Sequence, residues 1–171
     1  MMLVDSHMHV FPLMGGPAGH ESVCEHMRYL QHMIATHHQP VRRVNDGAIT
    51  TLRTLSKSPN PDLEGLLDVN FRASGNGKFT WTFGGEDYYI QYLPPNLTKL
   101  SAPPDLMVSQ MDFVGIDRAV LQTGHVYGRL NEFISETVRC YENRFWGLAM
   151  VDEWLADSSL QLKTLNHAIV N

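Results

Sequence analysis

Segments with the residue pattern of a β-strand alternate with segments that have the pattern of a helix along much of this chain. Residues 3–11, 118–123 and 145–151 are short, apolar and rich in residues that favour strands. Elsewhere the apolar residues recur at spacings of three and four, which is typical of one helix face. These predicted helices cover residues 106–114, 131–142 and 160–169. Strands that alternate with helices at this pitch predict βαβ units and a parallel sheet, so the expected fold class is α/β.

The stretch at about residues 12–100 interrupts the alternation and is predicted to be an insertion. It opens with a helix over residues 19–38, whose apolar side chains share one face. The histidines of this helix fall mostly off that face, which favours a solvated surface over a metal site; they are His20, His26, His32, His37 and His38.

The remainder of the insertion has two predicted parts. Residues 39–66 lack a sustained period and contain turn-forming prolines and glycines, which predicts a loop with one short helix near 48–55. Residues 79–93 alternate at period two around residues 84–87, which predicts a β-hairpin with a four-residue loop. The hairpin is too apolar to stand alone, so we expect a lid over a site or an arm in a dimer rather than core.

The number of strand–helix units bears on the architecture. Three units are too few for a closed barrel, which needs eight strands, and few for an open sheet, whose common sizes are ~4–6 strands. We therefore expect the chain to stop at Asn171 before the fold is complete.

Composition excludes several classes of partner. The formal net charge is −5, and the 13 Lys and Arg residues form no run longer than Arg42-Arg43, so nucleic acid is not an expected partner. Cys24 and Cys140 are too few to staple a secreted scaffold, which favours a reducing, cytoplasmic location. The N-terminus has no signal-peptide core and no apolar stretch reaches the ~20 residues of a membrane span, so no membrane partner is expected either.

The pair His7 and His9 is the first candidate site. Side chains two apart on a strand share a face, so the two imidazoles project together from Cα atoms roughly 6.5–7 Å apart. With 9 histidines in 171 residues, chance alone supplies about half of one such pair, so the spacing by itself is weak. Its position is more informative, because the pair ends the first predicted strand, where α/β barrels place their chemistry. Asp5 is expected on the same face, where it could orient a ligand from behind.

Three segments then carry a resemblance to a known family. Residues 3–11 (LVDSHMHVF) resemble the opening strand of the amidohydrolase-related family, and residues 107–122 and 143–152 look like its second and third strand segments. That family includes metal-dependent hydrolases and non-oxidative decarboxylases such as aminocarboxymuconate-semialdehyde decarboxylase. The resemblance implies that residues 1–171 form the N-terminal portion of a (β/α)8 TIM barrel, about three βα units, with the insertion inside and the remaining units absent.

The resemblance also implies the metal site. One divalent ion, with zinc expected, would be held by His7 and His9 together with a histidine from a mid-barrel strand and an aspartate from the last strand. Those two ligands would lie beyond Asn171. His167 falls in a predicted helix and is not proposed as a ligand.

Candidate substrate-binding residues follow from position and charge. His125 and Tyr127 lie in the loop after the second strand, and such loops line the mouth of a barrel. Arg72, with Arg42 and Arg43, could bind a substrate carboxylate through two hydrogen bonds. For each of these residues the ordinary alternative is an exposed side chain without a function.

Two functions of different classes remain open at this point. The first is a metal-dependent hydrolase that uses metal-activated water on an amide, ester or lactone, or a decarboxylase of a carboxylated small molecule. The alternative is a non-catalytic, truncated α/β fragment that acts at most as a binding or assembly module, because unpaired strand edges and apolar faces invite association. A homo-oligomer is compatible with either.

Overall fold

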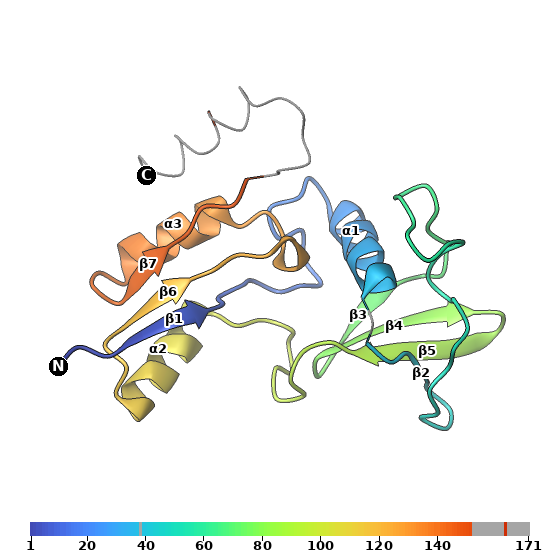
Figure 1. Cartoon of the computed structure of the whole chain (residues 1–171), viewed down its shortest axis with the longest axis horizontal. Coiled ribbons are helices and arrows are strands. Elements are labelled where there is room, and N and C mark those ends of the chain that lie inside the picture. Colours follow the sequence, from blue (N-terminus) through green and yellow to red (C-terminus); the bar gives the residue numbers. More distant parts are fainter. Residues whose placement is uncertain (38, 152–162, 164–171) are drawn as a thin grey trace. The chain divides into compact units, whose positions relative to one another are not determined.

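The computed structural model describes residues 1–37, 39–151 and 163, and the chain forms two compact units (Figure 1). Unit 1 contains Met1–Pro12 and the chain from Ala102 onward, and unit 2 contains Leu13–Ser101. The structure is of mixed α/β type, with a parallel sheet in unit 1 and an antiparallel sheet in unit 2.

Unit 1 is built on a three-stranded parallel sheet in the order β1-β6-β7 (Figure 1). The strands are β1 (Val4–Met8), β6 (Arg118–Leu121) and β7 (Phe145–Gly147), and the helices between them are α2 (Pro104–Val114) and α3 (Asn131–Cys140). The predicted alternation of strands and helices and the parallel pairing are confirmed, although each strand is shorter than predicted. The predicted helix over residues 160–169 lies outside the described residues except for Lys163.

Local sequence explains where the elements of unit 1 begin and end. Helix α2 starts at Pro104, whose missing N–H costs nothing in the first turn, and stops at Gly115, which adopts the left-handed conformation with φ 76°. Strand β7 packs closely on α3 through Gly147, where an added Cβ would meet Ile134 Cγ2 at 2.6 Å. The small residue therefore permits the contact between helix and strand.

Unit 2 combines one helix with a four-stranded antiparallel sheet in the order β2-β5-β4-β3. The helix is α1 (Val23–Thr36), and the strands are β2 (Arg42–Arg43), β3 (Arg72–Gly75), β4 (Lys78–Phe83) and β5 (Glu86–Gln91). The predicted helix and hairpin are present. The hairpin turn is shorter than predicted, because Phe83 pairs with Glu86 and leaves a two-residue Gly84-Gly85 turn in which both residues have positive φ.

The prediction of a short helix near residues 48–55 was wrong. The backbone there pairs with β2 instead, with Arg43 N donating to Ala48 O at 3.0 Å and Thr50 N to Val41 O at 2.9 Å. Asp46 and Gly47 form the turn between the two segments, since Gly47 has φ 69° and Asp46 accepts from the amide of Ala48.

The hairpin of β4 and β5 forms the interior of unit 2. Phe79, Trp81, Tyr88 and Ile90 are each at most 2% exposed. The indole Nε1 of Trp81 donates to Thr54 Oγ1 at 2.9 Å, so the one polar atom of this side chain is satisfied. The expectation that the hairpin is a lid or a dimer arm was therefore wrong, because its apolar side chains are covered within its own unit.

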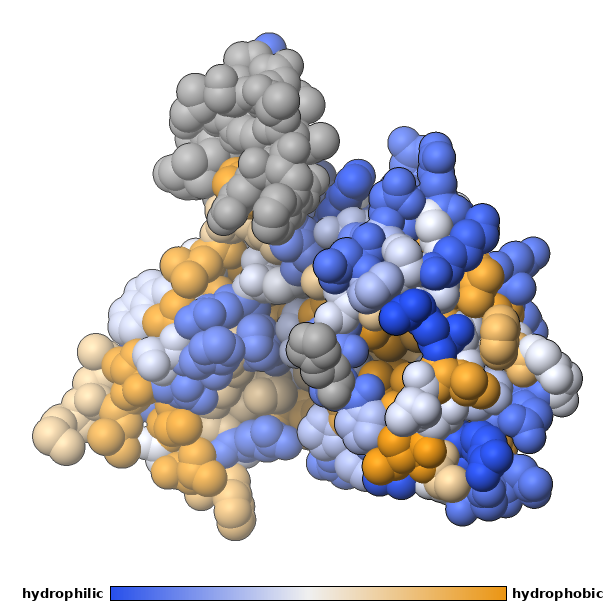
Figure 2. Space-filling view, turned by 45° about the vertical axis from the view of Figure 1, so that its right-hand side comes forward, coloured by the Kyte–Doolittle hydropathy of each residue, from blue (hydrophilic) through white to orange (hydrophobic). Residues whose placement is uncertain are grey.

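The surfaces of the two units differ in hydropathy. On the face that Figure 2 shows, apolar residues gather over unit 1, while hydrophilic residues predominate over unit 2 with smaller apolar groups among them. The most exposed large apolar side chain outside the N-terminal methionines is Phe113 at the end of α2. Among the residues that the structure describes, no helix is both long and apolar enough to cross a membrane.

Candidate metal site

The His7–His9 pair lies where strand β1 ends, beside the end of β6. His7 belongs to β1 and His9 follows it directly, while Gln122 follows the parallel neighbour β6. The carboxyl ends of adjacent parallel strands lie at the same edge of a sheet, which is where α/β folds bind ligands. His7 is exposed and His9 is partly buried.

The two imidazoles converge as the spacing predicted. His7 Nε2 and His9 Nε2 are 3.0 Å apart, and the ring planes stand at 87° to each other. Two nitrogens bound to one tetrahedral zinc ion, each at ~2.0–2.1 Å, would lie roughly 3.3 Å apart. A shift of the rings by a few tenths of an ångström would therefore let both nitrogens contact one ion.

The backbone carbonyl of Gln122 determines which ring nitrogen of His9 carries the hydrogen. The Nδ1 of His9 lies 2.8 Å from the backbone carbonyl oxygen of Gln122, which can only accept, so Nδ1 carries the hydrogen and Nε2 keeps a lone pair. Gln122 is itself held by two bonds to β1, from its amide N to Met8 O at 2.9 Å and from its side-chain Nε2 to Ser6 O at 3.0 Å. This carbonyl was missed from the sequence, because the contact spans 113 positions and uses a backbone atom.

A bulge in β1 changes the predicted role of Asp5. Asp5 pairs with Ala119 and Met8 with Leu121, so β1 uses one residue more than β6 between these points. The extra residue shifts the alternation, so Asp5 no longer shares the face of His7 and His9. Its Oδ1 accepts from the backbone amide of His7 at 2.9 Å, and the carboxylate therefore shapes the backbone rather than an imidazole.

Tyr127 places an aromatic ring beside His9. Its ring lies 4.9 Å from that of His9 and stacks on Phe11 at 4.5 Å with an interplanar angle of 17°. Burial raises the pKa of the Tyr127 phenol above its ordinary value, so the hydroxyl stays protonated and can donate a hydrogen bond. His125 begins the same short turn, His125–Tyr127, and is half-buried.

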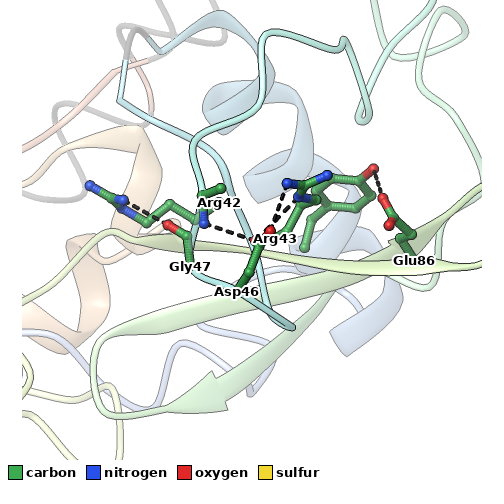
Figure 3. Close-up of polar contacts among 7 residues, drawn as sticks. Arg42, Arg43, Asp46, Gly47 and Glu86 are labelled. Atoms are coloured by element: carbon green, nitrogen blue, oxygen red, sulfur yellow. Dashed lines mark hydrogen bonds and ion pairs between the residues drawn. The ribbon is translucent and has the colours of Figure 1, made fainter.

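The three arginines considered as carboxylate ligands all have structural partners, and all belong to unit 2. Arg43 binds Asp46 through two hydrogen bonds of 3.2 and 2.6 Å, and Arg42 donates to Gly47 O at 2.8 Å (Figure 3). The amide of Ala48, together with Arg43, lowers the pKa of Asp46. Arg72 lies in β3, where its Nη1 donates to Asn70 O at 2.9 Å.

Two histidines of helix α1 and the segment before it contradict the expectation of a solvated face. His26 is fully buried and His20 is 8% exposed. Their side chains belong to the interior of unit 2, although His37 is exposed as expected. The helical spacing alone could not reveal this, because the segment before α1 covers the face on which His26 lies, through the bond from His26 Nδ1 to Gly16 O.

Within the described parts of the chain, no group of three or more His, Cys, Asp or Glu side chains is arranged to hold a metal ion. No family model, no curated protein and no solved structure matches this chain.

Proposed function

We propose that His7 and His9 bind one divalent metal ion, with zinc the expected ion, in a fold of the amidohydrolase-related type whose parallel sheet is part of a (β/α)8 barrel. The observation that carries this proposal is the convergence of two imidazole Nε2 atoms, 3.0 Å apart, at the carboxyl end of β1. The parallel order of β1, β6 and β7 is compatible with such a barrel.

The hydrogen bonds of the pair favour metal binding over a purely structural role. His9 Nε2 is a lone-pair acceptor because Nδ1 donates to Gln122 O. The short contact between the rings is then a hydrogen bond from His7 Nε2–H to His9 Nε2. If the His7 proton moves to Nδ1, the other tautomer of the neutral ring, two lone pairs face the same point, which is the arrangement that a cation requires.

A zinc ion held there would supply an activated water for hydrolysis of an amide, ester or lactone, or would hold a carboxylated substrate for decarboxylation. The residues of this chain would bind and orient the substrate beside it. Tyr127 offers a protonated hydroxyl as donor to a substrate oxygen, and its ring, beside that of His9, offers an apolar face to a planar or unsaturated substrate. His125, in the same turn as Tyr127, is a further candidate for this role.

Zinc titration of the full chain tests the proposal. We expect the wild type to bind Zn²⁺ in a competition assay with a chromophoric chelator, and His7→Ala and His9→Ala each to weaken binding at least tenfold, because each removes one of two ligands. Circular dichroism of both variants should match the wild type, since neither imidazole belongs to the buried core.

His37→Ala is the matched control, because His37 is an exposed histidine of unit 2. It should bind zinc as the wild type does. If zinc binding is unchanged by both His7→Ala and His9→Ala, the metal site is refuted and the alternative of a non-catalytic α/β module is favoured.

A further inference from the structure

Two histidines are stacked in the interior of unit 2 with polar atoms left over. The rings of His20 and His26 lie 5.0 Å apart at an interplanar angle of 15°, and the two residues are 8% and 0% exposed. Both Nε2 atoms are buried and have no hydrogen-bond partner within the described chain. A buried nitrogen without a partner is costly, so a pair of them is unusual and needs an explanation.

The Nδ1 atom of each ring has a polar partner, and this partner favours a hydrogen on Nδ1. His26 Nδ1 lies 2.7 Å from Gly16 O, a pure acceptor, so Nδ1 carries the hydrogen. His20 Nδ1 faces Glu25 Oε1 at 3.4 Å, which again favours the hydrogen on Nδ1. In a neutral ring, each buried Nε2 is then a lone pair that faces no donor.

Stacking argues against one metal ion shared by these two histidines. The lone pair of an imidazole nitrogen lies in the plane of its ring, and an ion bound by both would have to lie in both planes. Two nearly parallel rings 5.0 Å apart have no such common point within bonding distance. A proton is the remaining cation that either lone pair can accept without rearrangement.

We propose that the His20–His26 pair is a proton-sensitive switch of unit 2: it holds residues 13–22 on helix α1 while His26 is neutral, and it releases them when His26 takes up a proton. The bond from His26 Nδ1 to Gly16 O joins the two segments directly. The same segment leads into the cap of α1, where Ser22 Oγ accepts from Glu25 N and Glu25 Oε2 accepts from Glu21 N.

The groups around the pair set the direction of the response. Burial lowers the pKa of His26, against the opposing effect of the Gly16 bond, and repulsion from His20 lowers it further. The other groups that face the pair are Glu25, whose Oε1 lies 3.4 Å from His20 Nδ1, and Tyr29, whose ring lies 5.4 Å from that of His20. His26 is therefore the residue that must stay neutral for the segment to remain in place.

The sign of the pH dependence follows from this lowered pKa. The unfolded segment binds a proton at an ordinary histidine pKa of about 6.5, whereas the folded one resists it, so the open form binds more protons as pH falls below that value. The contribution of neutral His26 to the closed form is fully present above pH ~6.5. Below that pH the equilibrium constant for closing the segment falls by up to about tenfold per pH unit, until His26 takes up a proton in the closed form as well.

Amide hydrogen exchange of the full chain tests the switch. Backbone amides of Gly16, His20 and His26 donate to carbonyls within residues 13–22, so they report on opening of this segment. After correction for the intrinsic pH dependence of exchange, their protection should fall about fivefold between pH 6.5 and 5.5. His26→Asn should abolish this fall, because the Asn amide can donate to Gly16 O but does not titrate.

His37→Asn serves as the control and should retain the full pH dependence. A wild-type response that is flat, or equal to that of His26→Asn, overturns the proposal. Should His26→Asn fail to fold, NMR titration of the His26 imidazole in the wild type decides: a midpoint below the ordinary value of about 6.5 supports the switch, and one at or above it refutes the switch. None of these results depends on the metal site.

Discussion

Each unit of the molecule contains a pair of histidines. In both pairs one histidine is bound to a backbone carbonyl, but the surroundings of the two pairs differ. In unit 1, His9 donates from Nδ1 to the backbone oxygen of Gln122, and in unit 2, His26 donates from Nδ1 to that of Gly16. In both cases a backbone carbonyl sets the tautomer and leaves Nε2 as a lone pair.

The geometry beyond that shared bond decides what each pair can do. The rings of His7 and His9 stand at 87° at an accessible strand end, so their Nε2 atoms converge. The rings of His20 and His26 are stacked at 15° in the interior, so their lone pairs run side by side. The comparison teaches that a histidine pair becomes a candidate ligand set through ring orientation and access, whereas burial and stacking make it sensitive to protons.

The largest expected difference is in the loss of unfolding free energy when a tryptophan is removed from each unit. Trp81→Ala in unit 2 should lower the free energy of unfolding by ~3–5 kcal/mol, because it empties a fully buried site and leaves Thr54 Oγ1 without its donor. Trp146→Ala in unit 1 should cost much less, since Trp146 is 40% exposed and the guanidinium of Arg118 lies over its ring at 5.0 Å. Urea unfolding followed by circular dichroism measures the free energy of unfolding of both variants. Equal losses of stability would contradict the difference between the two tryptophans.

A smaller effect is expected where unit 1 is tightly packed. Gly147→Ala should cost ~1–3 kcal/mol, because the new Cβ would lie 2.6 Å from Ile134 Cγ2 and push α3 away from β7. Gly124→Ala is the control, since its added Cβ would meet only Tyr127 and Val126 at 3.8 Å or more. If both substitutions have the same small effect in urea unfolding, the packing of α3 on β7 is looser than described.

The smallest effect concerns the cap next to the buried pair. Ser22→Ala should cost about 1 kcal/mol, because the first turn of α1 loses the bond from Glu25 N to Ser22 Oγ. Ser109→Ala in α2 changes an exposed helical serine to alanine and should stay within ~0.5 kcal/mol of the wild type. A Ser22→Ala protein as stable as Ser109→Ala would show that the segment before α1 does not depend on its cap.

Patterns local in sequence predicted the elements of unit 1 well. Strand and helix patterns identified β6, α3 and β7, and the helix predicted over residues 106–114 lies within α2. The hairpin of β4 and β5 was also visible from its alternation. These features depend on neighbours within a few positions, so the residues themselves carry the information.

Features that depend on distant pairing could not be predicted in the same way. The strand β2 is two residues long, and it is a strand only because Arg42 and Arg43 pair with Tyr89 and Tyr88. The bulge in β1 moved Asp5 away from the face of His7 and His9, which a regular strand would not do. Both depend on where another strand lies, and no local pattern contains that position.

The sequence by itself determined that His7 and His9 project together from the end of a strand, because the geometry of an extended chain requires it. Only the tertiary structure decided which nitrogens are free, since Gln122 and Gly16 approach His9 and His26 from 113 and 10 positions away. It also decided that one pair is accessible and the other buried, because burial depends on what folds over a side chain and helical or strand periodicity describes only the side chain's own element.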